Sequence, residues 1–157
     1  MNNNLNLTFR CASEEDTPLI LSFIKELAEY EELLDKVTVT EDILKKNLFG
    51  KRKYAEAIFA EVDGKPIGQA LFFHNFSTFL GKPGIYLEDL YVKPEFREKG
   101  IGKALLYKVI EIAKERNCGR VEWVVLDWNK PAIEFYKKLG AEKMNGWLVY
   151  RLNETKF

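Results

Sequence analysis

The sequence predicts a single α/β domain, residues 1–157, whose mixed sheet is mainly antiparallel. Its length suits one domain, and helical and alternating apolar periods follow one another along the chain. A Gly-containing turn also joins two strand-like stretches directly. With 46% hydrophobic and 31% charged residues, the chain can bury a sizeable core. We expect the order β-α-α-β-β-β-α-β-α-β, with helices flanking the sheet.

The N-terminal third begins with a strand and continues with two helices. Alternating apolar residues predict a strand from Leu5 to Cys11. A capping box at Ser13 to Asp16 opens a helix whose apolar periodicity runs to about Leu34. A second, shorter helix lies between Val37 and Phe49, with Thr40 as its cap.

The middle of the chain predicts three strands. Ala55 to Val62 and Ile67 to Phe76 are strand-like, and Asp63 to Pro66 forms a short turn between them. These two segments should therefore form an antiparallel hairpin. A further strand spans Ile85 to Val92 and is stopped by Lys93-Pro94.

Two helices and two strands complete the expected fold. A helix is predicted from about Gly100 to Arg116, and Val121 to Leu126 has the apolar run of a strand covered on both faces. The next helix starts at Pro131 and ends near Leu139-Gly140, where Gly can take the left-handed cap. Asn145-Gly146 then turns the chain into a final strand, Trp147 to Leu152.

Composition excludes several classes of function. Twenty-four basic residues balance twenty-four acidic ones, so no global basic field would attract nucleic acid. No apolar run approaches the roughly 20 residues of a membrane span, and the N-terminus lacks a signal peptide, which predicts a cytoplasmic protein without a membrane partner. His74, Cys11 and Cys118 are too few and too scattered for a zinc site, so we expect no metal and assign all three to structure.

Local charge is uneven although the net charge is zero. Glu14 to Asp35 contains eight acidic residues against Lys25 alone, whereas Lys93 to Arg120 contains eight basic residues against four acidic ones. Two solvated helix faces would produce this pattern. The alternative is a site that joins an anionic ligand to a cationic one.

The stretch from Tyr86 to Lys103 reads as a strand, a charged loop and the start of a helix. Gly100 and Gly102 would let backbone N–H groups approach a phosphate, and the helix N-terminus adds its positive dipole. The familiar nucleotide loops do not fit, because Ala104 stands where a Walker loop has Ser or Thr and no third Gly completes a dinucleotide motif. A different pyrophosphate-bearing cofactor is expected.

The segment Arg97-Glu98-Lys99-Gly100-Ile101-Gly102 resembles the pyrophosphate loop of the GNAT acetyltransferase superfamily, which reads Arg or Gln, two residues, Gly, one residue, then Gly or Ala. Leu126 to Ala132 and Ala132 to Ala141 resemble the family's Asn-containing segment and its Phe-Tyr helix, which face the cofactor's thioester. The resemblance runs from about Phe9 to Trp147.

Other segments resemble one branch of that superfamily. Phe23 to Glu31 and Tyr86 to Asp89 are similar to the diamine acetyltransferases, which include spermidine/spermine and thialysine enzymes. Leu126 to Asn129 and Glu32 to Val37 look closer to the thialysine subgroup. The resemblance implies an acetyl-CoA-dependent N-acetyltransferase that acts on a primary amine of a small cationic substrate, by direct attack in a ternary complex, as a homodimer.

The resemblance also implies which residues contact each substrate. The implied cofactor contacts are Leu90, Tyr91, Val92, Arg97, Glu98, Lys99, Gly100, Ile101, Gly102, Lys103, Asn129, Lys130, Pro131, Ala132 and Tyr136. The implied amine contacts are Tyr30, Glu31, Glu88, Glu122, Trp123 and Val124. Trp123 could equally be a core residue, and Asn129 also suits a helix cap ahead of Pro131.

Tyr136 and Glu88 are the candidate catalytic residues. A phenol with a pKa of about 10 stays protonated at pH 7, so Tyr136 can donate to a thiolate leaving group; the alternative is a half-buried packing aromatic. Alternation places Glu88 on the same side of its strand as Tyr86, Leu90 and Val92. Glu88 could take a proton from the substrate ammonium, directly or through a water, although an edge Glu can also be merely solvated.

Glu31 falls within the apolar stripe of its predicted helix, in line with Ile20, Ile24 and Leu27. A carboxylate in that position needs a cation or a polar cleft, unless the helix has already left the core. Two other functions remain open: a protein lysine acetyltransferase, and a module that binds CoA or a polyamine without turnover. The sequence does not rank spermidine, spermine, putrescine, thialysine and lysine as substrates.

Overall fold

The sheet occupies the first of two units into which the chain divides, Met1–Val124 and Val125–Phe157, in a computed structural model that describes residues 6–157. Leu5, the first residue of the predicted N-terminal strand, lies outside the described residues. The five strands follow one another in chain order, β1 (Leu7–Cys11), β2 (Glu56–Val62), β3 (Lys65–Ser77), β4 (Lys82–Val92) and β5 (Val121–Glu122). All neighbours are antiparallel except β4 and β5, which confirms the mixed, mainly antiparallel sheet.

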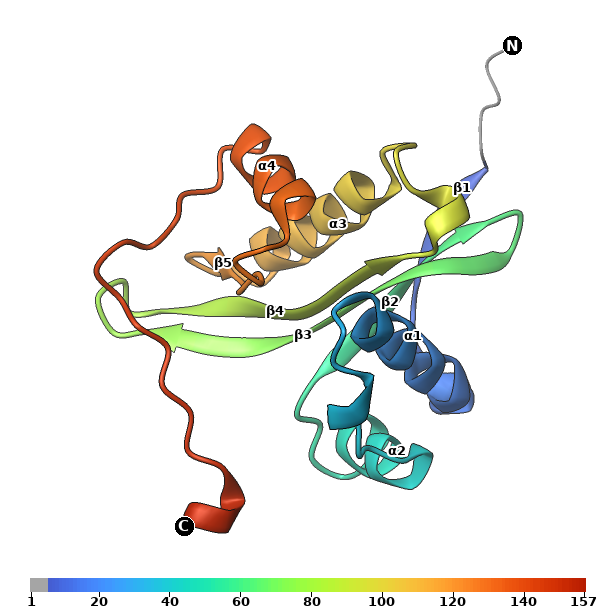
Figure 1. The fold of residues 1–157 in the computed structure, drawn as a ribbon, viewed down its shortest axis with the longest axis horizontal. Coiled ribbons are helices and arrows are strands. Elements are labelled where there is room, and N and C mark those ends of the chain that lie inside the picture. The colour runs from blue at the N-terminus through green and yellow to red at the C-terminus, as the bar shows by residue number, and fades with distance from the viewer. Residues whose placement is uncertain (1–5) are drawn as a thin grey trace. The chain divides into compact units, whose positions relative to one another are not determined.

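Three helices of this unit pack on the sheet. They are α1 (Thr17–Tyr30), α2 (Glu41–Phe49) and α3 (Ile101–Glu115), with short 3-10 turns at Glu14–Asp16, Leu34–Lys36 and Pro94–Phe96. Figure 1 shows α1 and α2 on one side of the sheet and α3 on the other. The second unit holds α4 (Lys130–Lys138) and a 3-10 turn at Glu154–Lys156.

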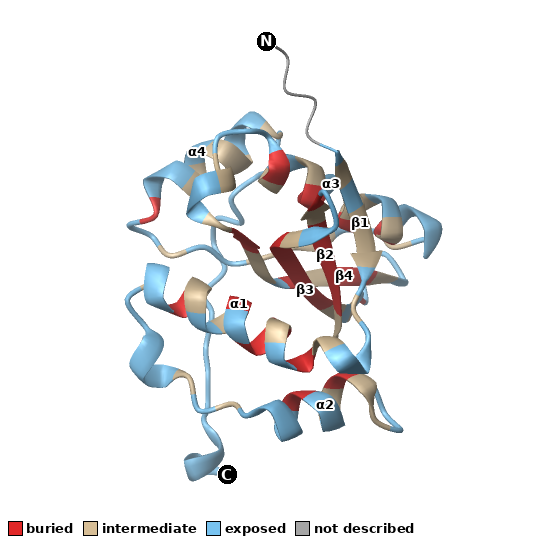
Figure 2. Ribbon diagram, turned by 90° about the vertical axis from the view of Figure 1, so that its right-hand side faces the viewer, coloured by how far each residue is buried: buried red, intermediate tan, exposed pale blue. Residues whose placement is uncertain are grey.

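The core beneath α1 and α2 is made of apolar side chains from both helices and from the sheet. Its buried members are Ile20, Leu21, Phe23, Leu44, Leu48, Ala57, Phe59, Leu71 and Tyr91. Figure 2 shows these buried positions as red stretches on the helix faces that turn toward the strands. Removing this apolar surface from water is the main force that holds the two helices on the sheet.

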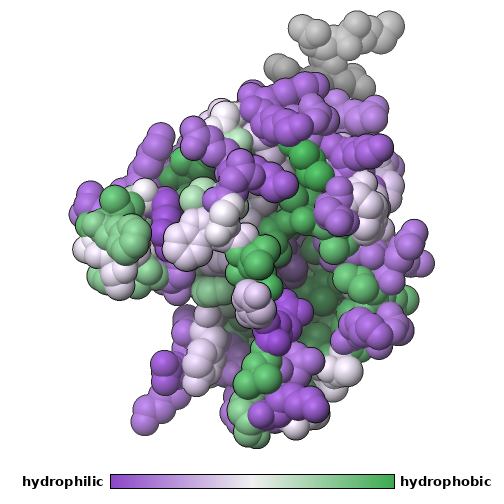
Figure 3. Space-filling view, turned by 60° about the vertical axis from the view of Figure 1, so that its left-hand side comes forward, coloured by the Kyte–Doolittle hydropathy of each residue, from purple (hydrophilic) through white to green (hydrophobic). Residues whose placement is uncertain are grey.

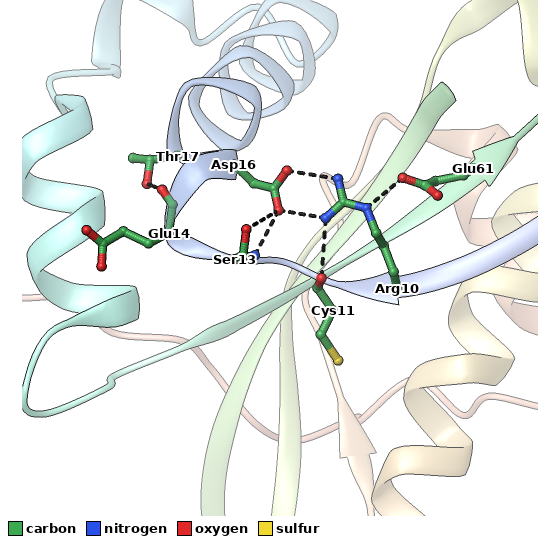
Figure 4. A network of polar contacts seen from close by, with 7 residues as sticks. All are labelled: Arg10, Cys11, Ser13, Glu14, Asp16, Thr17 and Glu61. Carbon is green, nitrogen blue, oxygen red and sulfur yellow. Dashed lines mark hydrogen bonds and ion pairs between the residues drawn. The ribbon is translucent and has the colours of Figure 1, made fainter. Parts of the chain in front are cut away.

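A polar network fixes the start of α1 (Figure 4). The guanidinium of Arg10 on β1 donates to both carboxylate oxygens of Asp16, at 2.6 and 2.8 Å, and to Glu61 of β2 at 2.6 Å. The hydrogen bonds from Arg10 lower the pKa of Asp16 to about 2. Asp16 also completes the capping box that the sequence predicts at Ser13. The first helix is therefore tied to two strands before its first turn.

The first helix ends earlier than predicted. It stops at Tyr30 and not near Leu34, because Glu32 adopts a left-handed backbone conformation with φ of 60°. The amide of Leu33 then donates to the carbonyl of Ala28 at 2.8 Å, which is the long hydrogen bond of a Schellman C-cap. Hydrophobic periodicity could not reveal this helix end, because Glu32 occupies the left-handed position where Gly is usual.

Strand β4 contains a bulge that the alternation argument did not foresee. Asp89 lies opposite Leu71, but Leu87 lies opposite Phe72, so Glu88 is an extra residue without a partner on β3. The prediction that Glu88 shares a face with Tyr86 and the later apolar residues is therefore wrong. Its side chain is exposed. A bulge shifts the side-chain parity of every residue beyond it.

Of two strand predictions near the C-terminus, one is confirmed only at its first two residues and the other is wrong. Instead of Val121 to Leu126, β5 covers only Val121–Glu122, and Val124 and Val125 are exposed. Trp147 to Leu152 forms no strand, and its five apolar residues are 66 to 87% exposed. Figure 3 shows surface hydrophobic side chains in green. An apolar run becomes a strand only when a neighbouring backbone pairs with it, and these segments find no such neighbour among residues 6–157.

The second unit confirms the predicted helix and its two ends. The side-chain oxygen of Asn129 accepts from the amide of Ala132 at 3.3 Å and caps α4. Gly140 takes a φ of 83°, and Ala141 N–H donates to the carbonyl of Tyr136 at 3.1 Å, which closes a Schellman motif. The turn at Asn145-Gly146 is present as well.

Candidate active site

Three carboxylates of the first unit, Glu31, Glu88 and Asp89, form what we call the acidic group. Glu31 is the half-buried C-cap residue of α1, and burial raises its pKa. Asp89 follows the bulge of β4 and lies opposite Leu71, a member of the core beneath α1, so it shares that face of the sheet. Burial, with the nearby charges of Glu88 and Glu31, raises the pKa of Asp89 to about 7.

A carboxyl that titrates near neutral pH can hold or release a proton in the physiological range. Two further negative charges close to it favour an incoming cation, and a bound cation would in turn drive Asp89 toward its ionised form. The arrangement can therefore bind an ammonium and accept a proton. Sequence reasoning missed Asp89, because the alternation count placed the functional face at Glu88. The sequence feature that could have indicated Asp89 is the adjacent acidic pair Glu88-Asp89 in the strand.

The loop Arg97–Lys103, which we call the phosphate loop, is anchored to the strand before it. Arg97 Nε donates to the carbonyl of Val92 at 2.9 Å. Its guanidinium also lies over the ring of Tyr30 at 4.7 Å and near that of Tyr91 at 5.5 Å. Tyr30, a predicted amine contact, thus borders the phosphate loop as well as Glu31.

The phosphate loop fits an anionic ligand through its backbone. Gly100 is the N-cap of α3 with a φ of 78°, and no side chain caps the helix. Within the described residues, the amides of Ile101, Gly102 and Lys103 donate no backbone hydrogen bond. A Cβ at Gly102 would meet only Val92, at 3.8 Å, so the space on that side of Gly102 is open. The positive φ of Gly100 and of Glu98 (61°) turns the loop sharply into α3.

Strands β4 and β5 separate soon after they meet. Their pairing covers only Ile85 with Val121 and Tyr86 with Glu122, so β4 from Leu87 to Val92 has no strand partner on that edge among the described residues. Backbone groups there can bind an extended ligand. The Tyr91 hydroxyl donates to Glu26 at 3.0 Å, and its ring is buried, which leaves only the Tyr91 backbone for such a role.

The predicted amine contacts on and after β5 differ in their environments. The Glu122 carboxylate accepts a hydrogen bond from Asn75 at 2.7 Å and pairs with Arg120 at 2.8 Å, so it is engaged within the sheet. Trp123 is half-buried and Val124 is exposed. The structure does not bring Glu122 into the acidic group.

The remaining predicted cofactor contacts belong to the second unit. Asn129 is buried and caps α4, Lys130 and Pro131 are exposed in its first turn, and Ala132 is half-buried. Tyr136 is half-buried on the same helix, with its ring centre 5.2 Å from that of Phe135. The position of Asn129 is compatible with the helix cap that it forms and with a cofactor contact. The role of Tyr136 stays a prediction.

The described part of the chain contains no group of three or more His, Cys, Asp or Glu side chains arranged to hold a metal ion. No helix in residues 6–157 is long and apolar enough to cross a membrane. Cys11 is exposed and Cys118 half-buried, both as free thiols.

Comparison with known proteins supports an acyl-transfer site. Residues 21–141 match the acetyltransferase (GNAT) family. The thialysine N-epsilon-acetyltransferase of Bos taurus is 41% identical over 153 residues, which cover 90% of this chain and 89% of that protein. The L-ornithine N5-acetyltransferase of Arabidopsis thaliana is 31% identical, covering 91% of this chain and 82% of the relative. An integron cassette protein from V. cholerae superposes with a TM-score of 0.80 at 26% identity, covering 98% and 96% of the two chains.

A phosphate loop at the start of α3, a bulged strand before it and this match define the class. The chain belongs to the acetyltransferase (GNAT) family. It is an acyltransferase enzyme with the mixed α/β fold of that family.

Proposed function

We propose that this enzyme transfers the acetyl group of acetyl-CoA to a primary amine of a small cationic substrate, by direct attack in a ternary complex. The observation that carries the proposal is that strand β4 leads from a carboxyl titrating near pH 7, Asp89, to an open phosphate loop within a single unit. An extended cosubstrate needs these two environments at its two ends, the amine site at its thioester and the loop at its pyrophosphate.

The cosubstrate supplies an acetyl group activated as a thioester. The amides of the phosphate loop bind its pyrophosphate, and Lys99 and Lys103 add positive charge. The unpaired edge of β4 at Leu90 to Val92 offers backbone groups to the pantetheine. A backbone N–H near Leu90 polarises the thioester carbonyl.

Glu31 and Glu88 hold the substrate ammonium, and Asp89 accepts its proton. Glu88 acting directly or through a water, as the sequence suggests, is the competing assignment. The freed amine nitrogen then bonds to the carbonyl carbon and the C–S bond breaks. Tyr136 donates its proton to the leaving thiolate, and the second proton of the attacking nitrogen passes through solvent to restore the tyrosine, which leaves a neutral amide and free CoA thiol. Holding amine and thioester in attack geometry supplies most of the acceleration, up to about 7 to 11 kcal/mol in favourable model systems.

The relatives narrow the range of amines. Both are named for acetylation of a side-chain amine of an amino acid, thialysine in one case and ornithine in the other. We therefore place such amino acids, with diamines and polyamines, in the substrate range. The resemblance to the family also supports a homodimer.

A thiol-release assay tests the proposal. Purified enzyme with acetyl-CoA should release CoA thiol when given ornithine, thialysine, lysine, putrescine or spermidine, and mass spectrometry should find the acetyl group on a primary amine. Transfer to lysine residues of a peptide but to none of the free amines would favour a protein lysine acetyltransferase. Binding of CoA without any transfer would reduce the protein to a binding module.

A further inference from the structure

We propose that a cationic cleft at the start of β2 binds the α-carboxylate of the acceptor, so that the enzyme prefers amino acids with a terminal amine over diamines of the same length. This inference rests on the proposed acetylation of amines and names the substrate class within it. Neither the family match nor the predicted site residues assign a role to this cleft.

The cleft has a volume of about 340 Å³ and lies where the chain enters β2 from α2. Arg52, Lys53 and Tyr54 line it from that connection, and Phe73 and His74 line it from β3. Its volume is in the range that holds a small ligand. The pairing of β2 with β3 stops at Glu56 and Phe72. Beyond Phe72, β3 therefore has no β2 partner, and the side of the sheet is open there.

The charges in the cleft are positive and available. Arg52 and Lys53 form no ion pair within the described part of the chain. The one carboxylate on the wall, Glu56, is taken by Arg116 in a bidentate pair at 2.5 and 2.8 Å. The guanidinium of Arg52 lies over the ring of Tyr54 at 4.9 Å, which limits its motion. A guanidinium held by stacking keeps its edge of N–H donors for a carboxylate.

The sheet sets the spacing between this cleft and the acidic group. Phe73 is two residues beyond Leu71 on β3, and Leu71 lies opposite Asp89 on β4. The pairing of Phe73 with Tyr86 puts both aromatic rings on one face, where they stack at 5.1 Å. Two strand residues span about 7 Å along the sheet, and β2 and β4 flank β3 at about 4.8 Å on either side, so the ligand and the side chains of Arg52 and Asp89 together bridge the separation. The side-chain nitrogen and α-carbon of a lysine-length amino acid are separated by five bonds, or roughly 6 Å when extended.

This arrangement discriminates between two classes of acceptor that each carry a reacting ammonium, amino acids and diamines. With the reacting amine at the acidic group, an amino acid places its carboxylate in the cationic cleft. A diamine of equal length places a second ammonium beside Arg52 and Lys53, where like charges repel it. The same cations thus favour one class and disfavour the other.

The test compares matched acceptors on matched variants. Ornithine with putrescine and lysine with cadaverine differ only in the carboxylate. The wild-type enzyme should show a higher kcat/KM for the amino acid in each pair. Arg52→Gln with Lys53→Gln should lower that preference about ten- to hundredfold, the equivalent of one or two charge-assisted hydrogen bonds, through a raised KM for the amino acid. The KM for acetyl-CoA should stay unchanged.

Lys51→Gln is the matched control, since Lys51 is an exposed cation next to Arg52 that does not line the cleft. It should leave the preference as it is. A wild-type preference for the diamines would overturn the inference while leaving the acetyltransferase proposal intact, and so would an equal loss for both members of each pair in the double variant. If none of these four amines, nor thialysine or spermidine, were acetylated, both the inference and the acetyltransferase proposal would be overturned.

Discussion

Asp89 of the acidic group precedes the last residues of β4, and the phosphate loop follows them. The charge of these two regions comes from different groups. In the acidic group the charge belongs to side chains, and burial raises the pKa of Asp89 and of Glu31. In the phosphate loop the positive potential comes mainly from backbone amides at the N-terminus of α3. Amine binding at the acidic group should therefore weaken when an isosteric substitution removes charge alone. Cosubstrate binding at the phosphate loop should weaken when a substitution adds atoms.

Arg97 connects the two regions. Its side chain bonds to Val92 and stacks on Tyr30, the residue before Glu31, so the phosphate loop and the end of α1 share one anchor. Its guanidinium is thus occupied with protein groups as well as being near the proposed pyrophosphate.

The largest effect is expected from a residue outside both regions. It tests whether the acidic group and the phosphate loop are sufficient for the reaction. Tyr136→Phe removes one hydroxyl and keeps the ring. If Tyr136 donates to the leaving thiolate, kcat should fall by roughly 10² to 10⁴, the usual span for one acid–base group, while Tm and CoA affinity stay near wild type. Steady-state kinetics with calorimetry measure both. A variant that keeps most of its kcat would leave solvent as the proton source.

Added atoms in the phosphate loop should weaken cosubstrate binding next most strongly. Gly102→Asp places a carboxylate where the pyrophosphate is proposed, and the nearest neighbour of the new Cβ is Val92 at an ordinary 3.8 Å. The KM for acetyl-CoA should rise about ten- to hundredfold or more with little loss of fold stability. Gly100→Ala is the contrast, because its φ of 78° penalises any side chain and should lower stability by about 1 kcal/mol. Unchanged CoA binding by Gly102→Asp would contradict the assignment.

Removing one charge from the acidic group should act on the amine alone. Glu31→Gln keeps the shape of the side chain, so the KM for the amine should rise about tenfold and that for acetyl-CoA should not. Glu29→Gln, on the exposed side of the same helix, serves as the control. Equal changes in both Michaelis constants would make Glu31 a structural residue.

A buried amide beside the core beneath α1 and α2 should give the smallest effect on catalysis, because it acts on stability only. Gln69 is 0% exposed, lies opposite Tyr91, and its side-chain nitrogen and oxygen have no hydrogen-bond partner within residues 6–157. Gln69→Met has a similar shape and no polar group to desolvate, so the free energy of unfolding should rise by about 1 to 3 kcal/mol. Chemical denaturation measures this, and a loss of stability would show that the amide is satisfied in solution.

Much of the fold could be predicted because its determinants are local. The capping box at Ser13, the turn predicted at Asp63 to Pro66 and the left-handed cap at Gly140 each depend on a few neighbouring residues, although the structure confines that turn to Asp63-Gly64. The last strand failed because Trp147 to Leu152 has a strand's composition but no pairing partner in the described chain. Composition alone cannot supply that partner.

The loop proposed to bind phosphate could be located from the sequence for the same reason. The phosphate loop depends on glycines at fixed spacing, which the sequence displays. Asp89 was missed because its raised pKa depends on a one-residue bulge and on burial, and both arise from tertiary structure. Glu122 was assigned to the amine, but Asn75 and Arg120, which are distant from each other in sequence, engage its carboxylate.

The raised pKa of Asp89 also has a consequence for stability. The folded protein keeps a proton on Asp89 up to about pH 7, whereas the unfolded chain loses it near pH 4. The native state therefore binds more protons between these values, and this carboxyl lowers stability as pH rises from about 4 to 7. Asp89→Asn should remove that part of the pH dependence.

The pH dependence of kcat/KM for ornithine tests the central claim most directly. If Asp89 accepts the ammonium proton, kcat/KM should rise through an enzyme group with a pKa of about 7. That limb should persist in Glu88→Gln and disappear in Asp89→Asn, whose remaining activity should be far lower. A limb that survives in Asp89→Asn, or that Glu88→Gln abolishes, would contradict the account and return the proton to Glu88.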